Sequence, residues 1–276
     1  MTGASLNCRL LVGTSGYSYA EWADAGFYPP ETPASKMLSH YVRSFKITEL
    51  NYTWYQMPKA VAIDRMRQSA GPDFLFAAKL TRTMTHEIES GKWRDQVRAY
   101  RDGIAPLVQT GQLAAVLIQT PPSFDRSKEN RLYLAALLDA LNGLPLAIEF
   151  RHVAWAMDRV FDALAARHVA LVSVDEPLLP GLFPPLPVVT NPDFFYVRFH
   201  GRNASGWRSG HMQKQFDYNY SENELKEWVD LRIAPMAERA GTGIIFFNNH
   251  VRAQAPRNAE SMIRLLTDAG LMAANP

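Results

Sequence analysis

The sequence predicts an α/β protein, a single-domain (β/α)8 TIM-like barrel spanning residues 1–276. Eight strand-like runs alternate with helix-like stretches along the chain. Several runs, such as LAAVLI and VALVSV, are apolar on both faces, as in parallel strands that are covered on two sides. Eight such units in this length match a closed barrel. A doubly wound open sheet is the structural alternative, but it normally has fewer strands.

The strand candidates are short apolar runs of alternating side chains. In chain order they are 9–13, 47–51, 74–79, 113–119, 146–151, 169–175, 195–200 and 244–248. Helices are expected where apolar residues recur three and four positions apart, at 35–45, 60–69, 97–108, 134–141, 158–167, 225–232 and 259–266. A capping box at 221–224 precedes the helix at 225–232.

Two stretches break the alternation of strand and helix. Residues 14–33 follow the first strand and are rich in Tyr, Trp, Gly and Pro, and residues 176–193 follow the sixth strand and are rich in proline. Proline excludes a long helix from the second stretch. Both are expected to be loops at the C-terminal mouth of the barrel, where the sites of such folds are built.

Composition and charge narrow the class of protein. The net charge is +2, so no long electrostatic footprint for duplex nucleic acid is evident. Cys8 is the only cysteine, which excludes an intramolecular disulfide and a cysteine-based metal site. The N-terminus lacks the pattern of a secretory signal, and no apolar run approaches the roughly 18 residues of a membrane span. We therefore expect a cytoplasmic protein with no membrane partner.

Polar residues close seven of the strand candidates, and period-two counting places them on one side of the sheet. They are Glu49, Asn51, Lys79, Gln119, Glu149, Arg151, Ser173, Asp175, Arg198, His200 and Asn248. Polar groups repeated at one end of buried strands are costly unless they are paired or used. The pattern indicates an active site or, alternatively, a buried ion-pair network that only fixes the barrel.

Four residues are the catalytic candidates. Glu149, beside Arg151 on one strand, is expected to stay ionised, and Glu49 is the better candidate base because its local neighbours are apolar and aromatic. The two carboxylates would share base and acid duties, and His200 would move a proton. Lys79 could form a Schiff base if burial lowered its pKa, but two carboxylates in the same lumen are expected to raise that pKa.

The other candidates would bind a ligand. Arg198 and Arg202 offer planar forks for a phosphate or carboxylate beyond the seventh strand, where such barrels often hold anions. The expected ligand-binding residues are Thr14, Ser15, Asn51, Tyr55, Gln119, Arg151, His152, Trp155, Asp175, Arg198, Arg202, Asn248 and Asn249. No cofactor is predicted. A divalent metal on His and carboxylate ligands stays open as an alternative, although no H-x-H or H-E-x-x-H spacing occurs.

The chain resembles the YecE-like family, also called domain of unknown function 72. The matching stretches run almost end to end and are VGTSGYSYAEW, FYP, ITELNYTWY, FAAKLTRTMTHE, QTPPSF, AIEFRHVAW, YVRFHG, FFNNH and PRNAE. Two residues depart from the family pattern: Trp54 stands where phenylalanine is expected, and Tyr17 where tryptophan is expected. The resemblance implies a TIM-like barrel, and it places most of the candidates above, with His86 and Gly201, in shared motifs. It brings no settled activity, and its likeness to apurinic endonucleases and xylose-isomerase-like enzymes is an analogy of fold.

Taken together, the sequence predicts a barrel enzyme, a hydrolase, isomerase or lyase, that performs acid–base chemistry on a small anionic ligand at the mouth. Two other classes stay open. One is a nucleic-acid-binding protein or metal-dependent nuclease, for which Arg202, Arg208, Lys214 and Arg252 lie on candidate rim loops. The other is a non-catalytic ligand-binding or scaffold protein. The oligomeric state stays open as well.

Overall fold

A computed structural model describes residues 8–273, so the first seven residues, which include part of the stretch examined for an export signal, lie outside the described part. Eight parallel strands close into a barrel in the order β1 to β8, and β1 pairs with both β2 and β8. The strands are β1 (Arg9–Ser15), β2 (Ile47–Leu50), β3 (Leu75–Lys79), β4 (Leu113–Gln119), β5 (Leu146–Glu149), β6 (Ala170–Asp175), β7 (Phe194–Phe199) and β8 (Thr242–Phe247). The predicted (β/α)8 barrel is confirmed, and the open-sheet alternative is excluded by the pairing of β1 with β8.

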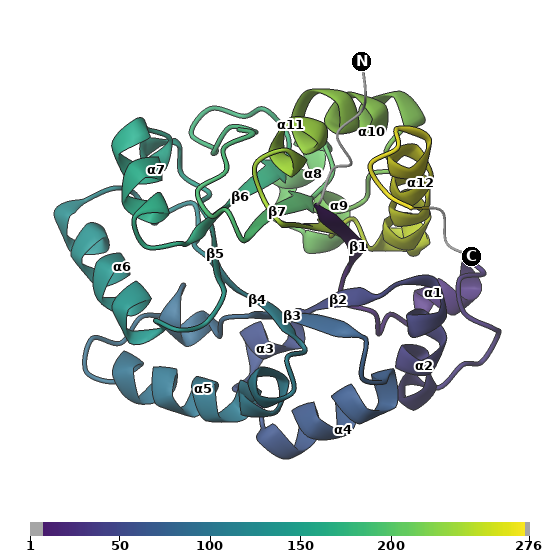
Figure 1. The fold of residues 1–276 in the computed structure, drawn as a ribbon, viewed down its shortest axis with the longest axis horizontal. Coiled ribbons are helices and arrows are strands. Elements are labelled where there is room, and N and C mark those ends of the chain that lie inside the picture. The colour runs from purple at the N-terminus through teal and green to yellow at the C-terminus, as the bar shows by residue number, and fades with distance from the viewer. Residues whose placement is uncertain (1–7, 274–276) are drawn as a thin grey trace.

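Helices surround the strands in a ring (Figure 1). They are α1 (Glu21–Asp24), α2 (Ala34–Ser44), α3 (Tyr52–Tyr55), α4 (Ala60–Ala70), α5 (Trp93–Gln109), α6 (Lys128–Ala140), α7 (Asp158–Ala165), α8 (Ala204–Ser209), α9 (Met212–Gln215), α10 (Glu222–Trp228), α11 (Ala234–Ala237) and α12 (Gln254–Asp268). Short 3-10 turns, η1 (Arg82–Met84), η2 (Val153–Trp155) and η4 (Val251–Ala253), follow β3, β5 and β8, and the π-helix η3 (Val229–Ile233) joins α10 to α11. Every helix that the sequence predicts is present, and the capping box at Ser221 and Glu224 starts α10 as expected.

The proline-rich stretch between β6 and β7 contains no helix, as predicted. It covers the sheet as an irregular segment instead, with Phe183 buried against the core. The Ser173 hydroxyl donates to the carbonyl of Leu186 at 2.7 Å, and the amide of Leu171 donates to Thr190 Oγ1 at 2.7 Å. Because these bonds satisfy polar groups on β6 and in the loop, the loop takes the place of a helix.

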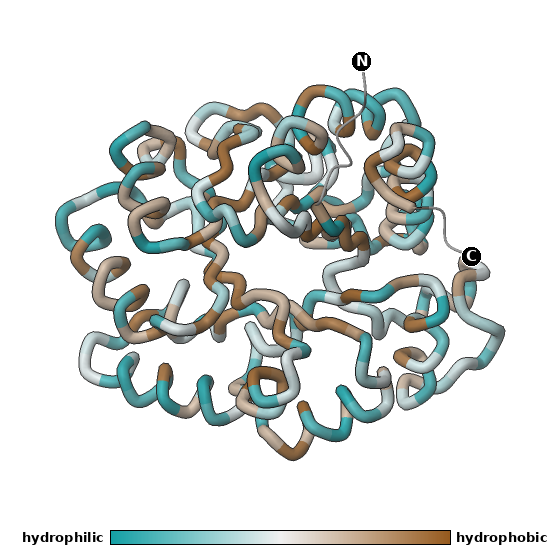
Figure 2. Tube along the Cα trace, in the orientation of Figure 1, coloured by the Kyte–Doolittle hydropathy of each residue, from teal (hydrophilic) through white to brown (hydrophobic). Residues whose placement is uncertain are grey.

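The core lies in two layers, one inside the barrel and one between the strands and the helices. Figure 2 shows hydrophobic residues along the strands and hydrophilic residues on the outer turns of the helices. In β7, Tyr196 and Arg198 point into the lumen, while Phe199 stacks on Phe247 at 4.5 Å in the outer layer. Among residues 8–273, no helix is both long and apolar enough to cross a membrane.

Candidate active site at the C-terminal mouth

Buried polar side chains gather in the lumen at the C-terminal ends of the strands, where the sequence predicts a site. Each arises from the alternation of a strand whose other face packs on the helices. The residues that the structure brings together there are Ser15 from β1, Glu49 from β2, Lys79 from β3, Glu149 and Arg151 from β5 and just beyond, Arg198 and His200 from β7 and just beyond, and Asn248 after β8. The expectation that charged groups from separate strands converge at one rim is confirmed.

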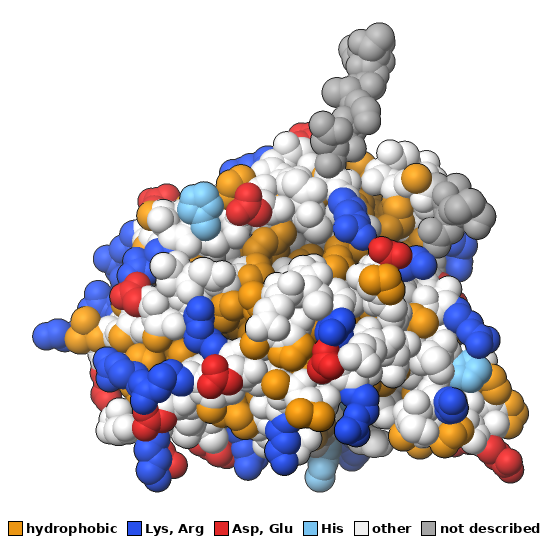
Figure 3. Space-filling view, turned by 60° about the horizontal axis from the view of Figure 1, so that its bottom comes forward, with side chains coloured by type: hydrophobic (Ala, Val, Ile, Leu, Met, Phe, Trp, Pro, Cys, Tyr) orange, Lys and Arg blue, Asp and Glu red, His pale blue; other side chains and the backbone are white. Residues whose placement is uncertain are grey.

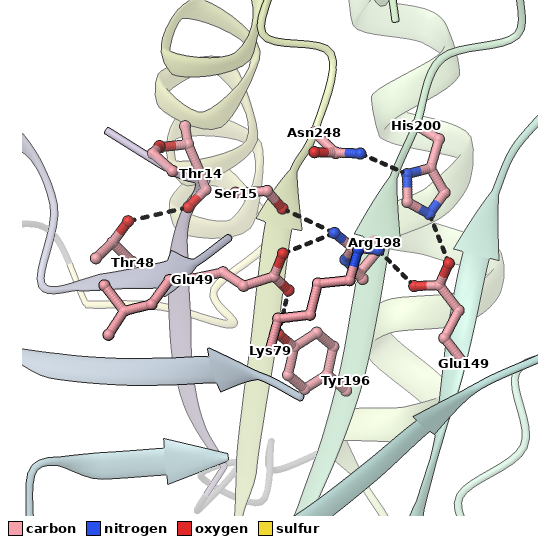
Figure 4. Close-up of polar contacts among 12 residues, drawn as sticks. Thr14, Ser15, Thr48, Glu49, Lys79, Glu149, Tyr196, Arg198, His200 and Asn248 are labelled. Carbon is pink, nitrogen blue, oxygen red and sulfur yellow. Dashed lines mark hydrogen bonds and ion pairs between the residues drawn. The ribbon is translucent and has the colours of Figure 1, made fainter. Parts of the chain in front are cut away.

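Arg198 lies at the centre of this cluster, between two carboxylates (Figure 4). Its Nη2 atom is 2.6 Å from Glu49 Oε1, and its Nη1 atom is 2.6 Å from Glu149 Oε2. The hydroxyl of Tyr196 donates to the second oxygen of Glu49 at 2.5 Å. Arg198 is only 1% exposed, and both glutamates are fully buried. Since an arginine fork with two carboxylates satisfies most of the donors and acceptors involved, the arrangement compensates buried charge that would otherwise be very costly.

A second set of contacts joins His200 and Arg151 to the same carboxylate. Arg151 Nε lies 2.5 Å from Glu149 Oε1, and its Nη1 atom donates to Glu176 at 2.6 Å. His200 Nε2 is 3.1 Å from Glu149 Oε1, and its Nδ1 atom faces the amide nitrogen of Asn248 at 3.1 Å (Figure 4). His200 Nε2 also lies 3.0 Å from Arg151 Nη2, so the Arg151 guanidinium and the Glu149 carboxylate both contact this ring nitrogen.

The surroundings lower the pKa values of both Glu149 and His200, which leaves the carboxyl group ionised and the imidazole neutral. Burial alone would raise the pKa of Glu149, but Arg151 and Arg198 outweigh it and hold that pKa well below its usual range. The sequence-based expectation of an ionised Glu149 is therefore confirmed. Burial, followed by the charge of Arg151, lowers the pKa of His200 to about 3, so its ring is neutral at physiological pH.

Lys79 behaves in the opposite way to the sequence-based expectation. Burial, followed by the positive charge of Arg198, lowers its pKa to about 7, and Glu49 and Glu149 offset only part of this effect. The predicted rise was wrong because Arg198 and Arg151 already neutralise the two carboxylates. Among the described residues, no carboxylate lies within ion-pair distance of Lys79, and its Nζ atom lies 5.0 Å from the ring centroid of Trp54.

The loop after β6 contributes a carboxyl group that the sequence analysis missed. Glu176 is 5% exposed, and burial raises its pKa to about 7 although Arg151 opposes this shift. Its Oε1 atom is buried and has no hydrogen-bond partner among the described residues. The sequence pattern indicates Asp175 instead. Val174 is the register partner of Arg198, so it faces the lumen, and Glu176, two residues further on, does so as well. This assignment needs the register between β6 and β7, which the sequence does not supply.

Four predicted ligand-binding residues point into the outer layer, away from the lumen. For Asp175, this corrects the expectation that the polar residues closing the strands share one side. Asp175 accepts hydrogen bonds from Arg202, Tyr220 and the indole of Trp228 in α10. The remaining three are Thr14, bonded to Tyr41 in α2, Trp155, stacked between Phe124 and Phe150, and Asn249, bonded to Asn258 in α12. The alternation along a strand gives relative faces only, so the wrong phase in one strand moves its polar residues behind the sheet.

Five further candidates lie near the mouth but outside the central network. Arg202 is bound to Asp175 at 2.6 Å, and Tyr55 is 55% exposed. Gln119 pairs in register with Glu149 and donates to the carbonyl of Thr120. The other two are His152, whose Nδ1 atom caps η2, and Asn51, whose Oδ1 atom is buried without a partner among the described residues.

The donor set does not fit the metal alternative. Among residues 8–273, no three His, Cys, Asp or Glu side chains are placed to hold one metal ion together. Of the carboxylates that could serve as ligands, Glu49 and Glu149 are bound by Arg198.

The comparisons with known proteins agree with this fold. The family model described as "Protein of unknown function DUF72" matches residues 11–276. The chain belongs to the DUF72 family. A DUF72 family protein from Thermotoga maritima is 34% identical, with a TM-score of 0.84 over 94% of this chain and 99% of that one. One from Enterococcus faecalis is 26% identical, with a TM-score of 0.84 over 94% of this chain and 95% of that one.

Two curated relatives are similar to this chain. The UPF0759 protein YunF of Bacillus subtilis is 29% identical over 272 residues, which are 93% of this chain and 94% of that protein. The UPF0759 protein YecE of Escherichia coli is 26% identical over 147 residues, which are 52% of this chain and 48% of that protein. The YecE-like resemblance that the motifs predicted is confirmed.

Proposed function

We propose that this DUF72 protein is an enzyme that performs acid–base chemistry on a small anionic ligand at the C-terminal mouth of its barrel. The observation that carries the proposal is the position of Lys79. Its amine lies at the mouth beside a network of four compensated charges, and no carboxylate pairs with it in the described part of the chain. An unpaired amine at this rim is suited to binding an anion and moving a proton.

Charge counting identifies the groups that are left to react. Arg151 and Arg198 carry two positive charges, and Glu49 and Glu149 carry two negative charges, so these four cancel. Lys79 and the carboxyl of Glu176 remain, each with a pKa of about 7. They come from β3 and from the loop after β6, which lie on different walls of the barrel. Two groups that titrate near neutrality are matched to general acid and base catalysis at physiological pH.

This proposal moves proton transfer away from Glu49 and Glu149, since both are held by Arg198. Glu176 is bound by Arg151 through one oxygen, and its other oxygen is left to react. Instead, the ammonium form of Lys79 would bind the anion and stabilise developing negative charge, and the carboxylate of Glu176 would accept the proton. Arg198 Nε, Glu176 Oε1 and Asn51 Oδ1 are buried without a partner among the described residues. A polar ligand would satisfy such groups, which supports binding at this rim. The reaction class is an isomerisation, elimination or hydrolysis.

The test begins with a thermal-shift screen of small carboxylates and phosphates. A ligand at about a hundred times its Kd adds roughly 2.7 kcal/mol of stability. Turnover of each ligand that binds is then followed by proton NMR. We expect Lys79→Met and Glu176→Gln to lose turnover, and Arg65→Gln, on the exposed face of α4, to keep it. Full turnover by Lys79→Met, or a screen in which no anion binds, would reject the proposal.

The lowered pKa of Lys79 also favours a variant of this chemistry. A neutral amine adds to a ligand carbonyl, and loss of one water molecule leaves an imine. Borohydride added during turnover would then trap a covalent adduct, detected by mass spectrometry in the wild-type protein and absent from Lys79→Met. Turnover without any adduct would assign Lys79 to proton transfer alone.

The nucleic-acid alternative finds less support at the rim. Arg202 pairs with Asp175 at 2.6 Å, and Arg252 pairs with Asp217 at 2.6 Å, so two of its four expected cations are compensated. Figure 3 shows acidic and basic side chains interspersed over the face that it draws. Such mixing weakens the extended positive field that phosphate backbones require.

A further inference from the structure

A crevice lies outside the barrel, between α6 and α7. Its volume is about 200 Å³, and its floor is apolar, formed by Leu134, Leu138, Phe150, Trp155, Val160 and Leu164. Phe150 alternates with Glu149 and Arg151 along the chain, so the crevice is on the opposite side of β5 from the polar cluster. It is therefore separate from the candidate active site.

Four arginines also line this crevice, namely Arg126, Arg131, Arg159 and Arg167. Arg167 pairs with Asp139 at 3.1 Å. In the described part of the chain, the other three have no carboxylate within ion-pair distance. At the left edge of Figure 3, on the side where α6 lies in Figure 1, basic side chains gather beside hydrophobic ones.

Arg126 bears the strongest sign that this arrangement is incomplete without an anion. Its Nε atom is buried and has no hydrogen-bond partner among residues 8–273. Burial, with the positive charges of Arg159 and Arg131, lowers the pKa of its guanidinium. Three uncompensated like charges around one cavity repel each other, and a bound anion would remove that repulsion.

We propose that this crevice is a second ligand site, which binds an amphiphilic anion: a short acyl chain or a single aromatic ring that carries a carboxylate or phosphate. The apolar floor takes the hydrocarbon part, and the planar guanidinium forks of Arg126, Arg131 and Arg159 bind the charged head. The volume is below the usual range for drug-sized ligands, which restricts the occupant to one small apolar group.

The test is isothermal titration of the full chain with octanoate, octyl phosphate and the neutral octanamide, all below their micelle-forming concentrations. We expect at least one of the two anions to bind at least tenfold more tightly than octanamide, and their order identifies the preferred head group. Equal affinity for the anions and octanamide, or no binding of either anion, would overturn the proposal.

Variants separate the crevice from any other site on the protein. The double variant Arg126→Gln with Arg159→Gln should weaken binding of the anion at least tenfold, whereas Arg65→Gln, on the exposed face of α4, should leave it unchanged. Ala163→Trp fills the crevice from its exposed edge and should abolish binding. Melting curves establish that each variant is folded. If the anion binds the folded double variant and Ala163→Trp as tightly as the wild type, the site lies elsewhere and the proposal fails.

Discussion

The guanidinium of Arg198 contacts carboxylates from two different strands and is almost completely buried. Replacing a buried ion pair by apolar residues is often neutral, but removing one partner leaves a charge without compensation. Loss of the Glu149 carboxylate should cost the most stability, because it contacts Arg198, Arg151 and His200 at once. Single substitutions here should therefore show whether the network stabilises the barrel.

Glu149→Gln should lower the free energy of unfolding by about 3–5 kcal/mol, because it leaves two buried arginines with one counter-charge fewer. Urea unfolding followed by circular dichroism measures this change. Asp217→Asn is the matched control, since it breaks the ion pair with the exposed Arg252 and should cost less than about 1 kcal/mol. Equal losses in the two variants would contradict the role given to the network.

The lowered pKa of Lys79 predicts a dependence of stability on pH. The folded protein binds fewer protons at this side chain than the unfolded chain between pH 7 and 10.5, so its contribution to stability rises with pH across that window. Allowing for partial exposure, the rise is on the order of 2 kcal/mol. The measurement is the free energy of unfolding of wild type minus that of Lys79→Met, from pH 7 to 9.5. A difference that stays flat over this range would show that the pKa is not lowered.

At the scale of elements, α5 lies so close to the segment before α4 that one position admits only glycine. A Cβ atom on Gly103 would lie 2.2 Å from the carbonyl oxygen of Pro58. Alanine is the better helix former by roughly 1 kcal/mol. The tertiary contact therefore opposes the local propensity, and the size of the two effects decides the outcome.

Gly103→Ala should destabilise the protein by about 1–3 kcal/mol, because the helix must move away from Pro58 and overpacking outweighs the gain in helix propensity. Thermal and urea unfolding of the full chain measure the change. Asp102→Ala, one residue away and exposed, should stay within about 0.5 kcal/mol of the wild type. An unchanged or raised stability in Gly103→Ala would mean that α5 moves freely at this contact.

On the scale of the whole molecule, the net charge of +2 and the compensated rim arginines give a weak external field. The largest group of close charges is buried in the lumen, where salt screens them little, and the uncompensated arginines of the outer crevice, Arg126, Arg131 and Arg159, form only a small accessible basic group. Association with a polyanion needs an extended basic surface, which these features do not supply.

We therefore expect no binding of a short DNA duplex at physiological salt up to roughly 10 µM protein. This concentration lies in the middle of the range of Kd values for ordinary non-specific binding. Fluorescence anisotropy of a labelled duplex measures it, with a repeat at low salt. Submicromolar affinity that falls steeply with added salt would restore the nucleic-acid alternative.

The sequence by itself determined the eight-strand barrel, the order of its elements and the rim at which polar groups collect, because the periods of strands and helices are local properties of the chain. It also determined that Glu49, Glu149 and Arg198 are candidates for that rim. Only the tertiary structure decided that Glu176, not Asp175, faces the lumen and that the pKa of Lys79 is lowered. The face of each strand depends on its register with its neighbours, and a pKa depends on every charge around the group, so neither follows from local sequence.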